Sequence, residues 1–128
     1  MLQERIEGKW IETFASVFKL CRVESGTVVA IISETQSRPV NVQLTELALN
    51  QLGAKAFHLI IPTPAQTTNI PIRSTGASVV LQGIKPVVEA LSNSELVVDL
   101  TVEGLLHAPE VSSVKEWCAY FDGEQRTP

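Results

Sequence analysis

Residues 27–61, TVVAIISETQSRPVNVQLTELALNQLGAKAFHLII, decide the fold of this chain. The stretch opens with TVVAIIS at residues 27–33, an apolar, β-branched run without polar alternation, which is typical of a strand covered on both faces. A second run, AFHLII at residues 56–61, closes it in the same way. Between the two runs, apolar residues at three- and four-residue steps predict a helix that ends at Gly53. The members of this stripe are Val40, Leu44, Leu47, Ala48 and Leu52. A strand, a helix and a strand in this order predict a parallel pair with a right-handed crossover.

The flanking segments extend the same pattern. Upstream, an apolar stripe predicts an amphipathic helix over roughly residues 3–22. The stripe consists of Ile6, Trp10, Phe14, Val17, Phe18 and Cys21. Downstream, apolar residues from Val80 to Leu91 predict two short helices, because Gly83 and Pro86 interrupt them. Residues 95–100, ELVVDL, then predict a third strand. The expected fold is α/β, a Rossmann-like three-stranded parallel sheet with flanking helices and an N-terminal amphipathic helix.

The C-terminal residues do not continue this repeat. After Pro109 the sequence follows no helix or strand period, and we expect no fourth strand. The outer edge of the third strand would then be open, which predicts low solubility or self-association. We expect a single α/β domain over residues 1–128, with a divergent tail at residues 113–128.

Composition excludes several classes of function. The chain has 128 residues, 45% of them apolar, a net charge of −4 and no sustained basic cluster, so nucleic acid is not expected as a partner. No signal peptide and no run of the roughly 20 apolar residues that a membrane span needs is found, so we expect a cytoplasmic protein without membrane contact. Cys21 and Cys118 belong to no ligand spacing and are interpreted as reduced thiols.

Two polar segments leave the carboxyl ends of predicted strands, where α/β folds place their ligands. In the long loop of residues 62–78, Arg73, Ser74 and Thr75 precede a helix and are candidates for anion contacts, although helix capping by Ser78 explains most of the pattern. The sequence is not a phosphate-binding loop signature.

The second segment carries His107, with Glu103 and Glu110 close by in the sequence. One histidine and two carboxylates are too few ligands for a divalent metal site. The alternative to a site role is that the two acids are solvated and that His107 is an ordinary loop histidine. His58, between apolar neighbours in the second strand, is interpreted as a structural imidazole. We predict no catalytic residue and no metal site within the chain.

Three strings carry a resemblance to a known superfamily: PTP at residues 62–64, PIRSTGAS at residues 71–78 and VDLTVEGLLHAPE at residues 98–110. They resemble the N-terminal domain of the superfamily that joins 2,5-dihydroxypyridine 5,6-dioxygenases to thermophilic-type leucyl aminopeptidases. The likeness covers roughly residues 10–112, so that residues 1–112 are taken as the family-like part of the domain, and the string LLHAPE is more similar to the dioxygenase branch.

The resemblance implies where the chemistry of such an enzyme lies. The metal ligands belong to a C-terminal domain outside this chain, so iron(II) or another divalent metal is implied only for the full-length family. The N-terminal domain helps to shape the pocket and the oligomer, which leaves room for a homo-oligomer. Leu106 and His107 match the positions that approach the substrate in the dioxygenases. A small-molecule substrate is likewise implied only for the full-length enzymes.

The tail departs from the family, which continues after this point into a fourth strand. A back-translation of residues 117–128 with wobble bases chosen to favour it, read one nucleotide later, gives a family-like strand. We therefore hypothesise a frameshift near Trp117 that truncates the product. The expected function is that of an N-terminal fragment of a metal-dependent dioxygenase that cleaves hydroxylated N-heteroaromatic rings, inactive alone. The alternatives are the N-terminal domain of a leucyl aminopeptidase-like metallopeptidase, or a non-enzymatic assembly or binding module.

Overall fold

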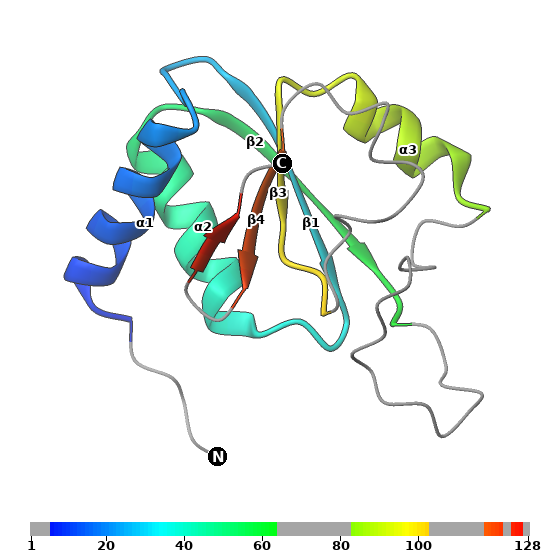
Figure 1. The fold of residues 1–128 in the computed structure, drawn as a ribbon, viewed down its shortest axis with the longest axis horizontal. Helices are drawn as coiled ribbons and strands as arrows, with labels where there is room; N and C mark the ends of the chain where they lie inside the picture. The colour runs from blue at the N-terminus through cyan, green and yellow to red at the C-terminus, as the bar shows by residue number, and fades with distance from the viewer. Residues whose placement is uncertain (1–5, 64–82, 103–116, 122–123, 127–128) are drawn as a thin grey trace.

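The computed structural model describes residues 6–63, 83–102, 117–121 and 124–126. Within them the helices and strands follow in this order: α1 (Gly8–Leu20), β1 (Val28–Glu34), α2 (Pro39–Gln51), β2 (Lys55–Ile61), α3 (Lys85–Ser92), β3 (Leu96–Asp99), β4 (Trp117–Phe121) and β5 (Glu124–Arg126). The strands form one sheet in the order β2-β1-β3-β4-β5. Figure 1 shows α1 and α2 against one face of this sheet and α3 against the other.

The predicted α/β fold is confirmed for the central strands. β1 pairs in parallel with β2 on one side and with β3 on the other, and the crossover between β1 and β2 contains α2. β1 is buried from Val29 to Glu34, as its continuous apolar run predicts. Glycine ends the crossover helix: Gly53 has φ +77°, and a Cβ there would lie 2.9 Å from Ser25 Oγ.

The expectation that the sheet ends at β3 is wrong. β4 pairs in parallel with β3 from Val97↔Trp117 to Asp99↔Ala119, and β5 pairs with β4 in antiparallel fashion. Strand pairing depends on the neighbouring strand as well as on local sequence, and a period search does not detect a partner. The aromatic and β-favouring composition of WCAYF was the one local indication of a strand there.

The second predicted strand is more exposed than its apolar sequence indicates. β2 is an outermost strand of the sheet, and among the described strands only β1 pairs with it. Residues 55–57 are exposed, Ile60 is 62% exposed, and only Ile61 is buried. A continuous apolar run therefore did not distinguish a central strand from an edge strand.

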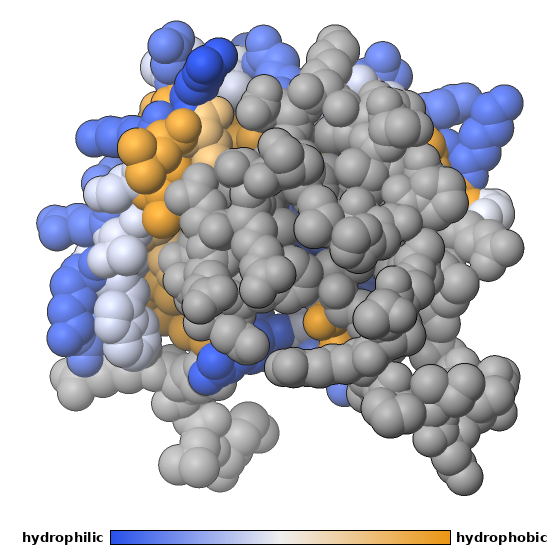
Figure 2. All heavy atoms as spheres, in the orientation of Figure 1, coloured by the Kyte–Doolittle hydropathy of each residue, from blue (hydrophilic) through white to orange (hydrophobic). Residues whose placement is uncertain are grey.

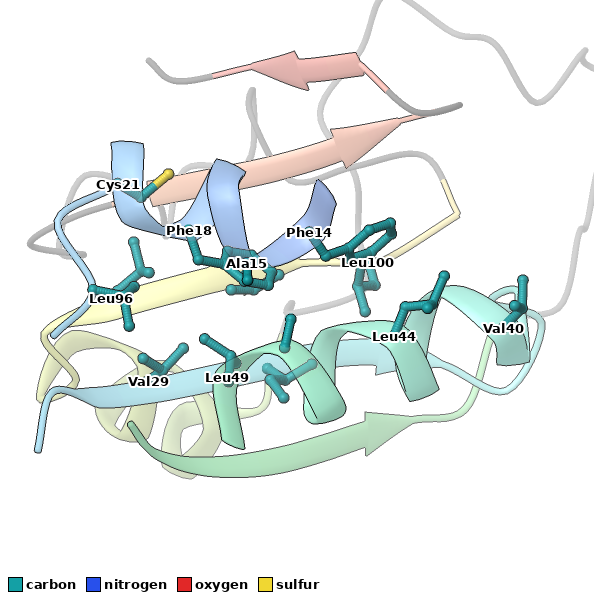
Figure 3. Close-up of a cluster of buried hydrophobic side chains, with 14 residues drawn as sticks. Phe14, Ala15, Phe18, Cys21, Val29, Val40, Leu44, Leu49, Leu96 and Leu100 are labelled. Atoms are coloured by element: carbon teal, nitrogen blue, oxygen red, sulfur yellow. The ribbon is translucent and has the colours of Figure 1, made fainter. Parts of the chain in front are cut away.

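The larger core lies between the sheet and the pair α1 and α2. Figure 3 shows Phe14, Ala15 and Phe18 of α1 on the same side of the sheet as Leu44 and Leu49 of α2. The Phe14 and Phe18 rings meet edge to face with centroids 6.3 Å apart. The second core, between the sheet and α3, consists of Ala30, Ile32, Ile61, Leu91 and Val97. Among the described residues, the sheet is thus covered by a thick layer on one face and a thin one on the other.

The helices agree with the predicted stripes except at a few positions. In α2, Val40, Leu44 and Ala48 are buried as expected, but Leu47 is 43% exposed, while Leu49 is fully buried. α2 contacts both α1 and the sheet, and its buried side is therefore centred away from Leu47. α3 is the second of the two short helices predicted around Gly83 and Pro86, and the first lies outside the described residues.

Exposed large hydrophobic residues lie on α1, α2 and β2 and at Val102 after β3. On α1, Trp10 is 38% and Leu20 is 76% exposed. In Figure 2, hydrophobic side chains appear on the flank of the molecule where Figure 1 places α1. Among the described residues, no helix has the length and apolar character required to cross a bilayer.

Candidate functional site

The connections between the strands single out the end of the sheet at which the parallel strands have their carboxyl ends, here called the carboxyl edge. From β1 the chain crosses to β2 on one side, and from β2 it returns past β1 to β3 on the other side. Between β1 and β3, therefore, the direction of the connections reverses. In open α/β sheets, ligands bind at the carboxyl ends of the strands beside such a switch point. Three described segments meet at this carboxyl edge: residues 34–38, residues 61–63 and residues 99–102.

At the carboxyl edge, buried polar side chains bind the residues that follow β3. Glu34 and Asp99 are 5% and 1% exposed, at the ends of β1 and β3. Asp99 Oδ1 accepts hydrogen bonds from Thr101 N at 3.0 Å and from Thr101 Oγ1 at 2.5 Å. Glu34 Oε2 accepts one from Val102 N at 2.5 Å. The two carboxylates thus hold the backbone that follows β3.

Ser37 strengthens the same connection. Its hydroxyl donates to Leu100 O at 2.7 Å and accepts from Glu34 N at 2.8 Å. Leu100 N in turn donates to Ile32 O at 2.9 Å, so the parallel pairing continues past the end of β3. The loop after β1 is therefore fixed to the residues after β3 through side chains and backbone.

On its other side the same loop is tied to the end of β2. Thr35 N donates to Ile61 O at 3.1 Å. Thr63 N donates to Thr35 Oγ1, and Gln36 N donates to Thr63 Oγ1, both at 3.1 Å. Residues 34–37 therefore join the points at which the chain leaves β2 and β3.

The site residues proposed from sequence lie outside the described residues. This holds for Leu106 and His107, for Arg73, Ser74 and Thr75, and for Glu103 and Glu110. The structure does describe Thr63 and Val102, the last residues before the two segments that carry them, and both belong to the carboxyl edge. Sequence reasoning did not identify Glu34 and Ser37. The available indication was that polar residues follow a buried strand directly.

His58 has a partner for each ring nitrogen, as expected for a structural imidazole. Nε2 lies 2.6 Å from Ser33 Oγ, and Nδ1 lies 3.2 Å from Glu46 Oε1. An acid, a histidine and a serine in this order resemble the arrangement that activates a nucleophilic serine. Ser33, however, is only 2% exposed, and a substrate could not reach its hydroxyl. The three residues instead tie edge strand β2 to β1 and α2.

A surface pocket of about 270 Å³ lies beside this group, lined by Ile31, Glu46, Asn50, Ala54, Ala56, Phe57 and His58. It is on the α2 side of β2, and its lining includes none of the residues that form the hydrogen bonds of the carboxyl edge. In the part of the chain that the structure describes, no three His, Cys, Asp or Glu side chains group as metal ligands.

Comparisons with known proteins give concordant results. The family model of 2,5-dihydroxypyridine 5,6-dioxygenase (NicX) matches residues 9–119. A solved structure of 2,5-dihydroxypyridine dioxygenase from Pseudomonas putida KT2440 is similar, with a TM-score of 0.73 and 28% sequence identity. The match covers 84% of this chain and 31% of that protein, so the chain spans less than a third of its length. No curated protein sequence matches the chain.

Proposed function

Because the chain belongs to the 2,5-dihydroxypyridine 5,6-dioxygenase family, we propose that it forms the N-terminal layer of a metal-dependent dioxygenase. Such an enzyme would cleave the ring of a hydroxylated N-heteroaromatic compound. The observation that carries this proposal is the family match over residues 9–119, which the similarity to the solved dioxygenase supports. Since that family is named for ring cleavage, we propose this chemistry in preference to peptide hydrolysis.

The contribution of this chain would be made at the carboxyl edge. We propose that Leu106 and His107 contact the substrate there, with Arg73, Ser74 and Thr75 as further loop contacts. The fixed positions of Thr63 and Val102 support this assignment, since they are the residues from which the two segments depart. The proposal includes a cytoplasmic location, a small-molecule substrate and a homo-oligomeric assembly.

Iron(II) or another divalent metal is implied by the proposed chemistry, and it would activate oxygen beside the substrate. The described residues do not bring together the three ligands such a site needs. We therefore assign no step to a metal held by them, and we propose that the chain has no turnover alone. The match to 31% of the related dioxygenase supports this, because the remaining length can hold the reacting groups.

Metal retention and turnover test the proposal directly. The chain is incubated anaerobically with iron(II), desalted and analysed by mass spectrometry, and then mixed with 2,5-dihydroxypyridine and oxygen. We expect no retained iron, no loss of the pyridine absorbance and no hydrolysis of leucine amide. One retained iron per chain together with pyridine consumption would contradict the proposed inactivity. Hydrolysis of leucine amide would favour the aminopeptidase alternative.

Ligand mapping tests the pocket itself. A nuclear magnetic resonance titration with 2,5-dihydroxypyridine should shift the backbone amides of Thr63 and Val102 at the carboxyl edge. The amides of Gly26 and Gly53, at the opposite edge, serve as controls and should not move. The variant His107→Ala should weaken the shifts. Shifts confined to the opposite edge, or none at millimolar ligand, would count against a substrate-facing role.

A further inference from the structure

We propose that Glu34 is a positioning residue, whose carboxylate holds Val102 and thereby fixes where the chain enters residues 103–116. The proposed function assigns the substrate contacts Leu106 and His107 to that segment, and the catalytic meaning of this inference rests on the proposed function. The contact between Glu34 and Val102 does not depend on the proposed function. It joins the end of β1 to the residues after β3 across 68 positions of sequence.

The contact joins a backbone amide to a buried glutamate side chain. Glu34 Oε2 lies 2.5 Å from Val102 N, and the Glu34 residue is 5% exposed. An ionised glutamate oxygen accepts a stronger hydrogen bond than a neutral acceptor does, and a surrounding of low polarity strengthens the bond in either state. A buried carboxylate is costly unless such partners compensate its lost hydration. The position of Val102 is therefore tightly coupled to that of Glu34.

The backbone that carries this carboxylate is itself held in place. Glu34 N donates to Ser37 Oγ, and Ser37 Oγ donates to Leu100 O two residues before Val102. These two bonds and the Glu34–Val102 bond close a ring between the loop after β1 and residues 100–102. A closed ring restricts direction as well as distance. Positioning of this kind matters in catalysis, because a displacement of about 1 Å in a reacting group can lower a rate roughly a hundredfold.

The same loop fixes the second exit. Through Thr35 and Gln36 it holds Thr63, from which residues 64–82 depart. Glu34 binds Val102 after β3, while Thr35 binds Thr63 after β2. The loop after β1 therefore sets the separation between the two points from which the proposed substrate contacts leave the sheet.

The structure supplies a matched control at the opposite edge. Glu95 Oε2 accepts a hydrogen bond from Val28 N at 2.6 Å across 67 positions, with the same donor and acceptor types and nearly the same span, although Glu95 is exposed where Glu34 is buried. It lies before β3 and beside the start of β1, at the amino edge of the parallel strands. Removing this bond should disturb Val28 without affecting Val102.

The test compares Glu34→Leu, Glu34→Gln and Glu95→Leu by hydrogen exchange of backbone amides. We expect Glu34→Leu to raise the exchange rate of Val102 roughly tenfold or more, relative to the rates of Ile31 and Val97 in the sheet. Glu34→Gln keeps an acceptor oxygen at the same reach and should restore most of the protection. Glu95→Leu should affect Val28 alone. An equal rise at Val102, Ile31 and Val97 in Glu34→Leu would mean general destabilisation and would overturn the inference.

A second measurement covers the case in which Glu34→Leu does not fold. In the native chain the Val102 amide proton should resonate downfield, and in Glu34→Gln it should move upfield. An unchanged Val102 resonance in Glu34→Gln would overturn the inference.

Titration with 2,5-dihydroxypyridine separates this inference from the proposed function. If the native chain shows no response at the carboxyl edge while the exchange results hold, the proposed function fails and the positioning contact stands. If the native chain responds and the leucine variant responds to the same extent, the positioning role fails. We expect Glu34→Leu to weaken the response and Glu95→Leu to leave it unchanged.

Discussion

At the scale of single residues, His58 shows how a polar group is accommodated in an apolar strand. Its ring is 18% exposed and lies between Ser33 Oγ and the half-exposed Glu46 carboxylate. A carboxylate can only accept, so Nδ1 carries the proton toward Glu46. In the neutral ring, Nε2 then accepts from the Ser33 hydroxyl. The group is a polar link between three elements.

This link predicts unequal effects of its two ends. Ser33→Ala should lower the free energy of unfolding by about 1–3 kcal/mol, because Nε2 loses its partner in a largely buried place. Glu46→Gln should cost less than about 1 kcal/mol, since that side chain is half exposed and its amide oxygen still accepts. Urea denaturation of the two variants measures the difference. A larger loss for Glu46→Gln would contradict the assignment of Ser33 as the buried end.

The sequence predicted the structural role of His58, but it did not predict which residues His58 and Glu34 would bind. A histidine between Phe57 and Leu59 indicated a structural imidazole, because a histidine within an apolar strand is more often a hydrogen-bonded structural residue than a ligand. Its contact with Ser33 spans 25 positions, and that between Glu34 and Val102 spans 68. Such pairs depend on the order of strands, which local patterns do not report. The roles of Leu106 and His107 stay predictions.

At the scale of elements, α2 illustrates how tertiary contacts select among apolar residues. Leu47 and Leu49 stand two positions apart, yet Leu47 is 43% exposed and Leu49 is fully buried. Residues two apart point to different sides of a helix. The predicted stripe was centred too close to Leu47, because the sequence alone did not show that α2 packs on α1 as well as on the sheet.

Alanine substitutions at these two positions test the packing. Leu49→Ala should lower the free energy of unfolding by about 2–5 kcal/mol, because it removes buried methyl groups and leaves a cavity. Leu47→Ala should change it by no more than about 0.5 kcal/mol, as is usual for surface positions. Thermal or urea denaturation of both variants provides the comparison. Similar losses at the two positions would contradict the observed orientation of α2.

Prediction of the strands depended on how local their signals are. The runs at β1, β2 and β3 were recognised because they are continuous and apolar. β4 was not, because its five residues follow no extended period and its stability depends on pairing with β3. The exposed position of β2 was missed for a related reason, since only the strand order places it at an edge.

At the scale of the whole molecule, β2 and β5 are the outermost strands of the sheet among the described residues, because β4 pairs with β3. Unpaired edges with apolar side chains promote association. On β2, Phe57 is 37% and Ile60 is 62% exposed, and only Lys55 carries a fixed charge. We therefore assign the expected self-association to the β2 edge and no longer to β3.

Charge placement on this edge should suppress that association. Ile60→Lys should shift the chain toward monomer at high concentration, because an edge lysine resists strand pairing. Leu20→Lys, which alters an equally apolar and still more exposed position on α1, should have little effect. Sedimentation velocity over a hundredfold concentration range distinguishes them. A shift to monomer with Leu20→Lys alone would assign the contact to α1.

The unequal layers on the two faces of the sheet have a consequence for how the molecule comes apart. Among the described residues, the buried cluster under α1 and α2 contains 14 residues, and that under α3 contains 5. Proteins open first where few apolar contacts must be broken. The most accessible partly unfolded form would therefore keep α1, α2 and the central strands while α3 detaches. A protease should therefore cleave the chain around α3 faster than within α1 or α2.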